Sequence, residues 1–358
     1  MRYRWKKNSA GKLVKSAVIY TFDEHHINQK DVDPLAAGIC EKLNNAGFES
    51  YIVGGAVRDL LLKKIPKDFD IASQATPSKI KKLFANARII GKRFRLVHVF
   101  FGDKIFEIAT FRSFEDGATG NTFGCIEDDV KRRDFTMNAL FYDPKKQLVL
   151  DYIGGFKDIN DRKIKPIIPL KTIFEDDPVR MIRAVKYASL SGFKIPFFLR
   201  EKIKRSTSLL TRISPSRLTE ELSKILKSPS AGKIIEELFA IGLYPYLQPQ
   251  ASKLISSSPS FRKRYFKTLN ALYKKGTYEA EEYVDSLSEG LDALVRDYIN
   301  DNVDWQNTSE DAYKDVFMLA RKFVLPMNPP RIELGRALRI MFAEHDITVK
   351  RWQKFVRV

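Results

Sequence analysis

Cysteine, histidine and long apolar runs are all scarce in this sequence. Only two cysteines, Cys40 and Cys125, and four histidines occur among 358 residues. So few cysteines exclude a disulfide scaffold and fit a reducing compartment, and the absence of CxxC or HxxxH spacing excludes a recognisable zinc site. No apolar run reaches the roughly 20 residues that a membrane helix needs, and no apolar segment follows the basic N-terminus. We therefore expect a soluble, cytoplasmic protein without membrane contact.

Acidic residues are also few relative to basic ones. The chain has 62 Lys and Arg against 44 Asp and Glu, which gives a net charge of +18 and a pI near 9.6. Such a surplus attracts polyanions, and nucleic acid is the first candidate. The 44% hydrophobic and 12% aromatic content is that of a globular protein, and the length suffices for two or three domains.

The stretch at 51–72, YIVGGAVRDLLLKKIPKDFDIA, contains the first chemical signal. It predicts a short strand that stops at Gly54-Gly55, then a short helix and a second strand. Two adjacent glycines after a strand allow a tight turn and bring backbone amides close to a phosphate. This turn is therefore a candidate phosphate-binding site.

The second strand of that stretch carries two aspartates. Side chains alternate along a strand, so Asp68 and Asp70 point the same way while Phe69 faces the core. Two neighbouring carboxylates repel each other unless a cation lies between them, and hard oxygen ligands favour Mg²⁺. A phosphate-binding turn beside a metal-binding strand indicates phosphoryl transfer.

The segment that precedes this stretch is basic. Residues 1–33 are expected to form a solvated, mobile leader, with an additional RNA contact as the alternative. Asp33-Pro34 then predicts the N-cap and first residue of a helix that ends at Gly47. The basic residues of the leader are Arg2, Arg4, Lys6, Lys7, Lys12 and Lys15.

Strand patterns dominate the part of the chain that follows. Thr76-Pro77 starts a further helix, and strands are expected at 88–90, 96–101 and 105–111. Glu107 would provide a third metal-binding carboxylate if its strand neighbours that of the two aspartates; otherwise it is a surface residue. We expect a mobile loop at 112–124.

A helical pattern at 126–140 contains Arg132, Arg133, Asp134 and Asn138. Asp134 and Asn138 are four residues apart and would share a helix face. Such a face suits ribose hydroxyls and triphosphate oxygens, although a solvated face with an internal salt bridge explains it equally. A hairpin at 140–151 and a hinge at Gly154-Gly155 follow.

After the hinge the strand signals fade, and Asp177-Pro178 caps a helix that carries Arg180. From there on the pattern is helical, with helices expected at 198–205, 215–226, 231–241 and 261–274 and further helical segments to the C-terminus. A carboxylate accepts from an exocyclic amine and a guanidinium donates to a ring nitrogen, so Asp177 and Arg180 together could accept ATP and CTP but refuse GTP and UTP. A surface ion pair is the alternative.

Five motifs occur in order: Gly54–Asp59, Asp68–Asp70, Arg132–Asn138, Asp151–Gly155 and Asp177–Arg180. Over roughly 51–226 this series resembles the class II nucleotidyltransferase family, which includes bacterial poly(A) polymerases and tRNA CCA-adding enzymes. The resemblance implies an α+β head with a mixed β-sheet and helices, followed by an all-α neck, body and tail. We assign 1–33 to the leader, 34–155 to the head, 156–228 to the neck and 229–358 to the helical body and tail.

The resemblance also implies roles for individual residues. Asp68 and Asp70 would bind two catalytic Mg²⁺ ions, with Asp134 as a further active-site carboxylate. The incoming ATP would be bound by Gly54, Gly55, Arg58, Asp59, Arg132, Arg133 and Asn138, and its base selected by Asp177 and Arg180. RNA would be the other substrate, and Arg93, Arg95 and Arg183 would be weaker RNA or phosphate contacts.

The stretch GKRFRLVHV at 91–99 resembles bacterial poly(A) polymerases more than CCA-adding enzymes. It favours template-independent addition of AMP to RNA 3′ ends. Asp176 stands where the family commonly has glutamate, the loop at 112–124 is short for a poly(A) polymerase, and no long arginine-rich tail follows. These departures keep addition of CCA to tRNA as the alternative.

Overall fold

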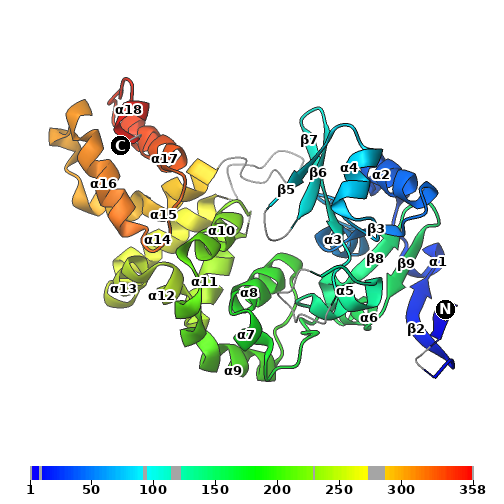
Figure 1. Cartoon of the computed structure of the whole chain (residues 1–358). Helices are drawn as coiled ribbons and strands as arrows, with labels where there is room; N and C mark the ends of the chain where they lie inside the picture. Colours follow the sequence, from blue (N-terminus) through cyan, green and yellow to red (C-terminus); the bar gives the residue numbers. More distant parts are fainter. Residues whose placement is uncertain are drawn as a thin grey trace. The chain divides into compact units, whose positions relative to one another are not determined.

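The structure, a computed structural model, describes residues 2–7, 10–91, 95–113, 122–228, 230–272 and 287–356. The chain divides into two compact units. The head unit comprises Met1–Asp176 with Phe193–Pro196, and the helical unit comprises Asp177–Gly192 with Phe197–Val358. Figure 1 labels the helices and strands of both units.

One mixed sheet runs through the head unit. Its nine strands, among the described residues, lie in the order β1-β2-β9-β8-β3-β4-β7-β6-β5, and β4 pairs with β7 in parallel while the other neighbours are antiparallel. The expected mixed sheet is thus confirmed. The strands are β1 Arg2–Lys7, β2 Leu13–Tyr20, β3 Ser50–Val53, β4 Asp70–Ser73, β5 Ala87–Ile90, β6 Leu96–Phe101, β7 Lys104–Thr110, β8 Leu140–Asp143 and β9 Leu148–Asp151.

Short helices cover the sheet (Figure 1). In the head unit, α2 packs against β3 and β4, α4 against β5 and β6, and α3 against β3 and β8. The expected cap at Asp33 is confirmed, because its carboxylate accepts hydrogen bonds from Leu35 N and Ala36 N at 2.8 and 3.4 Å. The helices are α1 Phe22–His25, α2 Pro34–Asn45, α3 Gly55–Leu61, α4 Pro77–Leu83, α5 Ile126–Arg132, α6 Gly155–Asn160 and α7 Ile173–Asp176, with 3₁₀ turns η1 Gln29–Asp31 and η2 Thr136–Asn138.

The central strands are buried on both faces. Ile52 and Ile71 are fully buried on one face, which is the face of β3 and β4 opposite to that of Tyr51 and Ala72. On the other face a cluster joins the sheet to α5; it consists of Tyr51, Val53, Ala72, Phe111, Ile126, Val130, Ala139, Phe141 and Leu150. Burial on both faces explains why these strands appear in the sequence as continuous apolar runs.

The basic N-terminal segment is not a mobile leader, and that expectation was wrong. β1 and β2 form an antiparallel hairpin, and β2 pairs with β9 through Val18–Asp151, Ile19–Leu150 and Tyr20–Val149. These pairings extend the sheet by two strands. Lysine and arginine are typical of edge strands, so a basic edge strand can look like a solvated tail in the sequence.

The predicted length of the helix at 126–140 was also wrong. α5 ends at Arg132, and Arg133 is extended, with φ −69° and ψ 159°. Phe135 is fully buried and forms a β-bridge with Pro166. This tertiary pairing overrides the helical spacing, so Asp134 and Asn138 do not share a helix face.

The diglycine at 154–155 is a fixed turn, and the expected hinge was wrong. The buried Asp151 carboxylate accepts hydrogen bonds from the amides of Ile153, Gly154, Gly155 and Phe156 at 2.8–3.0 Å. A Cβ on Gly155 would lie 2.2 Å from the Thr136 carbonyl oxygen, so no other residue fits there without rearrangement. The turn ties α6 to η2.

The helical unit is all-α over its described residues, as expected. Helices expected at 215–226 and 231–241 have those bounds, and no helix of the described chain is long and apolar enough to cross a membrane. The helices are α8 Val179–Ser191, α9 Phe197–Ser206, α10 Pro215–Leu226, α11 Ala231–Ile241, α12 Tyr244–Leu247, α13 Pro249–Ser257, α14 Pro259–Ala271, α15 Leu287–Asn302, α16 Tyr313–Phe323, α17 Arg331–Glu344 and α18 Gln353–Val356, with 3₁₀ turns η3 Thr207–Arg212, η5 Trp305–Asn307 and η6 Glu310–Ala312.

Candidate active site

The diglycine turn and the second aspartate lie next to each other in the head unit. Gly54 has φ +70° and ψ −131°, a backbone conformation that residues with a side chain rarely adopt. On the neighbouring strand, Asp70 is the cross-strand partner of Val53, the residue before Gly54. Directly paired residues in an antiparallel ladder have Cα atoms about 4.5–5.5 Å apart. A carboxylate therefore starts β4 beside the turn after β3.

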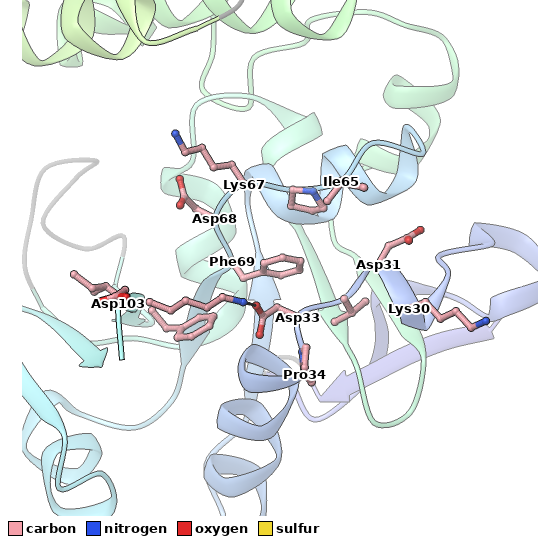
Figure 2. A pocket seen from close by; sticks show the side chains of 14 residues that line it. Lys30, Asp31, Asp33, Pro34, Ile65, Lys67, Asp68, Phe69 and Asp103 are labelled. Carbon is pink, nitrogen blue, oxygen red and sulfur yellow. Dashed lines mark hydrogen bonds and ion pairs between the residues drawn. The ribbon is translucent and has the colours of Figure 1, made fainter. Parts of the chain in front are cut away.

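Asp68 and Asp70 are both exposed, and Phe69 between them is buried. This alternation agrees with the sequence prediction, but β4 begins at Asp70, so Asp68 lies in the connection before the strand. Figure 2 shows Asp68 and Phe69 pointing in different directions at a pocket of about 610 Å³. The same pocket is lined by Asp33, whose Oδ2 lies 2.6 Å from Lys104 Nζ.

Glu107 lies on the strand that neighbours Asp70, as the sequence hypothesis required. The parallel register Ile71–Ile108 places Glu107 beside Asp70 and on the same face of the sheet. Its carboxylate, however, faces His98, with Oε2 3.6 Å from Nε2. No group of three His, Cys, Asp or Glu side chains among the described residues is arranged to hold a metal, so the expected role of Glu107 as a third ligand is not supported.

Arg58 connects α3 to the turn before β8. Its guanidinium is 7% exposed, donates from Nε to Asp59 Oδ1 at 2.8 Å, and donates from Nη1 to Asn138 Oδ1 at 2.9 Å. Arg58 and Asp59 are adjacent in the sequence, whereas Asn138 is 80 residues after Arg58, and the structure brings all three together. They form the side of the site that follows the diglycine turn.

Arg133 reaches the same group of residues from the end of α5. It donates from Nη1 to the Asn138 carbonyl at 3.0 Å, and its Nε and Nη2 donate to Asp129 Oδ2 at 3.1 and 2.9 Å. These contacts hold a half-buried guanidinium in a fixed orientation. Burial lowers the pKa of the neighbouring Arg112 guanidinium, and the carboxylates of Asp129 and Glu107 oppose that shift.

Arg132 and Asp134 differ from Arg133 in their surroundings. Arg132 is buried and donates from Nη1 to the Ser113 carbonyl at 2.8 Å, which ties α5 to the backbone after β7. Asp134 is half-buried, and its carbonyl oxygen accepts from Ile167 N at 3.2 Å. Of the three head arginines expected to bind nucleotide, Arg58 and Arg133 donate hydrogen bonds to Asn138.

The expected base-selecting pair lies in the helical unit, at the start of α8. Asp177 and Arg180 are both buried, and Asp177 Oδ1 accepts from Val179 N at 3.2 Å. The ion-pair partner of Asp177 is Arg217 of α10, whose Nη2 donates to Oδ1 and Oδ2 at 3.1 and 2.9 Å. The Asp177 carboxylate is therefore oriented by a residue from another helix.

Two family models match parts of the chain. The family model described as "Poly A polymerase head domain" matches residues 50–165, and that described as "Probable RNA and SrmB- binding site of polymerase A" matches residues 192–255. The chain is 40% identical over 252 residues to "Poly(A) polymerase I" of Salmonella typhi, covering 66% of this chain and 54% of that protein.

The chain belongs to the class II nucleotidyltransferase family. A second group of relatives is represented by the "CCA-adding enzyme" of Geobacillus thermodenitrificans, 36% identical over 224 residues, with 61% of this chain and 55% of that protein covered. The solved CCA-adding enzyme of Bacillus stearothermophilus in complex with CTP is 27% identical, with a TM-score of 0.58 over 87% of this chain and 83% of that one. The chain spans about half the length of the curated relatives it matches.

Four further sequence expectations concern Arg93, Arg95, Arg183 and the loop at 112–124. Arg93 and the central part of the loop at 112–124 lie outside the described residues, whereas Arg95 is exposed just before β6. Arg183, expected to contact RNA, forms an ion pair with the buried Glu221, with 2.8 Å between Nε and Oε1.

The sequence did not identify the residues that hold the candidate site residues in place. Asp129 holds Arg133 and Arg217 holds Asp177, yet neither was a candidate. Asp129 could have been found, because it lies four residues before Arg133 in a helical pattern. Arg217 could not have been found in this way, because Asp177 and Arg217 are 40 residues apart and no local sequence pattern links them.

Proposed function

We propose that this chain is a template-independent poly(A) polymerase that transfers AMP from ATP to RNA 3′ ends and releases pyrophosphate. The pairing of Asp70 with Val53, beside the turn at Gly54, is the observation that supports phosphoryl transfer most strongly. The choice of poly(A) addition follows the relatives: the poly(A) polymerases are 38–40% identical to the chain and the CCA-adding enzymes 34–36%.

The residues present fit Mg²⁺. Asp68 and Asp70 are exposed carboxylates two residues apart, and Mg²⁺ is commonly held by one or two carboxylates together with waters and substrate phosphates. When bound, two such ions would lower the pKa of the RNA 3′-hydroxyl and stabilise the departing pyrophosphate. From the motif at residues 132–138 we propose Asp134 as a further active-site carboxylate, although it does not form a three-carboxylate metal group with Asp68 and Asp70 among the described residues.

The other residues of the site bind and orient the nucleotide. The turn at Gly54-Gly55 presents backbone amides to the triphosphate, and Arg58 and Arg133 spread its negative charge. Asn138 fixes both guanidiniums, because its side-chain oxygen accepts from Arg58 and its carbonyl from Arg133. Preorganised cations need no rearrangement when charge develops. The RNA hydroxyl attacks the α-phosphorus in line as the bond to pyrophosphate breaks, and this single displacement needs no covalent enzyme intermediate.

Selection of ATP is assigned to Asp177 and Arg180. The carboxylate accepts from the exocyclic amine of adenine and the guanidinium donates to its ring nitrogen, whereas guanine would leave both groups unsatisfied. RNA is bound through its phosphates by the basic surface, with Arg95 and Arg183 among the contacts, so the affinity should fall steeply as salt rises. Two unpaired cysteines and bacterial relatives support a bacterial cytoplasm as the location.

Addition of CCA to tRNA is the second candidate. Its specific support is the likeness to solved CCA-adding enzymes, one of them in complex with CTP. Asp177 and Arg180 do not discriminate between the candidates, because cytosine and adenine present the same amine and ring nitrogen.

A single assay separates these candidates. Purified protein is incubated with Mg²⁺, an unstructured RNA oligonucleotide and each nucleoside triphosphate in turn, and a parallel series uses tRNA that lacks its CCA end. A long ladder from ATP alone supports poly(A) addition. Incorporation of CTP into the truncated tRNA supports CCA addition, and no extension of any RNA refutes both.

A further inference from the structure

Two cations on one face of β1, in the N-terminal hairpin formed by β1 and β2, are paired with carboxylates of the head. Arg4 Nη2 lies 2.6 Å from Glu49 Oε1, and Lys6 Nζ lies 3.3 Å from Glu127 Oε1. Because side chains alternate along a strand, the residues between and beside these two cations point to the opposite face. The hairpin is therefore fixed in place. On its other face Tyr20 stacks on Phe156 of α6, whereas the part around Tyr3 and Trp5 is exposed.

That outer face is aromatic. Tyr3 is 40% exposed and Trp5 is 57% exposed, and their rings pack edge to face with centroids 6.3 Å apart. Lys15 of β2 lies over the Tyr3 ring, with Nζ 3.7 Å from the centroid, and Leu13 beside it is 59% exposed. A tyrosine, a tryptophan and a leucine exposed together form a surface that is expected to have a partner.

The charge of the hairpin indicates which partner. Residues 2–22 contain six lysines and arginines and no aspartate or glutamate. Carboxylates of the head neutralise Arg4 and Lys6, both on the inner face. The outer face combines aromatic rings with lysines and has no carboxylate of its own, which is the composition of a surface on which single-stranded RNA stacks its bases and pairs its phosphates.

We propose that the outer face of the β1–β2 hairpin, formed by Tyr3, Trp5, Leu13 and Lys15, is an accessory binding surface for single-stranded RNA. It lies outside residues 50–165 and 192–255, where the family models match. The proposal rests on RNA being the substrate of the active site. It adds a contact for the part of the RNA away from the reacting 3′ end.

Binding without catalysis tests the surface directly. A fluorescein-labelled oligo(A) RNA of about 15 nucleotides, long enough for one stacking platform, is titrated with full-length protein in EDTA without ATP. The variant Y3S/W5S should bind at least about fivefold more weakly, since loss of one base–aromatic stack has that effect or more. The variant Y3F/W5F, which retains both rings, should bind like the wild type.

Matched controls keep the result specific. F22S removes a different aromatic ring of the head that is 48% exposed, and it should leave RNA affinity unchanged. RNA should also quench the tryptophan fluorescence of the wild type more than that of W5F, since Trp352 is buried and Trp305 is stacked on His345. Circular dichroism verifies that each variant is folded.

Equal affinity of folded Y3S/W5S and wild type overturns the proposal. So does a dimer in sedimentation that Y3S/W5S dissociates, because a second copy would then cover this face. AMP addition is assayed separately: its absence in the wild type refutes the proposed function, whatever the binding titration shows. If both hold, the KM for RNA should rise in Y3S/W5S while that for ATP stays unchanged.

Discussion

Arg58 and Asn138 are 80 residues apart and are joined by a 2.9 Å hydrogen bond from Nη1 to Oδ1. The bond connects α3, which follows the diglycine turn, to η2, which precedes β8. Because Arg133 donates to the backbone of the same asparagine, one residue positions two cations of the site. Asn138 is thus a positioning residue between a phosphate-binding turn and a second arginine.

Asn138→Ala should therefore lower both stability and nucleotide binding. Removing the acceptor of a guanidinium that is 7% exposed should decrease the free energy of unfolding by about 1–3 kcal/mol, measured by urea denaturation. The KM for ATP should rise as well, because Arg58 loses its orientation. Asn138→Asp retains an acceptor oxygen and should recover most of both. Wild-type stability in the alanine variant would contradict this role.

Asp70→Asn should abolish AMP addition without weakening RNA binding. The substitution keeps the size of the side chain but removes the charge that would hold Mg²⁺, and loss of metal assistance should lower kcat by at least about 1,000-fold. Primer extension measures activity and fluorescence anisotropy measures RNA affinity. Asp23→Asn, on an exposed residue of α1, is the control with normal activity. Polymerisation by the Asp70 variant would refute the metal assignment.

Much of the fold could be predicted from local signals. The cap at Asp33, the start at Thr76-Pro77 and the diglycine turn each depend on residues adjacent in sequence, and the structure has all three. The ordered motifs also pointed to residues that are close together in the structure. Arg58, Arg133 and Asn138 were all candidates, and both arginines donate hydrogen bonds to Asn138.

The errors occurred where distant parts of the chain decide the structure. β1 and β2 are strands because β2 pairs with β9, some 130 residues later, and no local pattern reports that pairing. The helix at 126–140 ends early because Phe135 bridges Pro166. Arg217 orients Asp177 from another helix. Local propensity cannot predict such contacts, since tertiary pairing overrides it.

Glu221 should make the helical unit sensitive to acid. Burial alone would raise the pKa of this carboxyl, but Lys186 and Arg183, at 2.6 and 2.8 Å, outweigh it and lower the pKa to about 2. A folded-state pKa below the unfolded value of 4.5 gives stability that is present above pH 4.5 and is lost as the pH falls toward 2. The full effect is about 3 kcal/mol.

Glu221→Gln tests that linkage. The variant should be less stable than the wild type at neutral pH by about 3–5 kcal/mol, because Lys186 remains buried without its counter-charge. Below pH 4.5 the difference should shrink, as the wild type loses the same interaction. Glu220→Gln, on the exposed side of α10, is the control and should behave like the wild type. A stability difference that does not change with pH would show that Glu221 acts by packing alone.

Asp177→Ala should weaken the choice of base more than the rate of transfer. Without the carboxylate, the amine of adenine loses its hydrogen-bond acceptor. Guanine, in turn, no longer leaves a buried carboxylate without a donor. The preference for ATP over GTP in kcat/KM should therefore fall about 10- to 100-fold. Arg217→Met should have a smaller effect in the same direction, because it frees a carboxylate now held at 2.9 Å. Asp176→Ala removes the exposed neighbouring carboxylate and should leave selectivity unchanged. If GTP is still refused by the Asp177 variant, the base is read elsewhere, and the Asp177–Arg217 pair only joins α8 to α10.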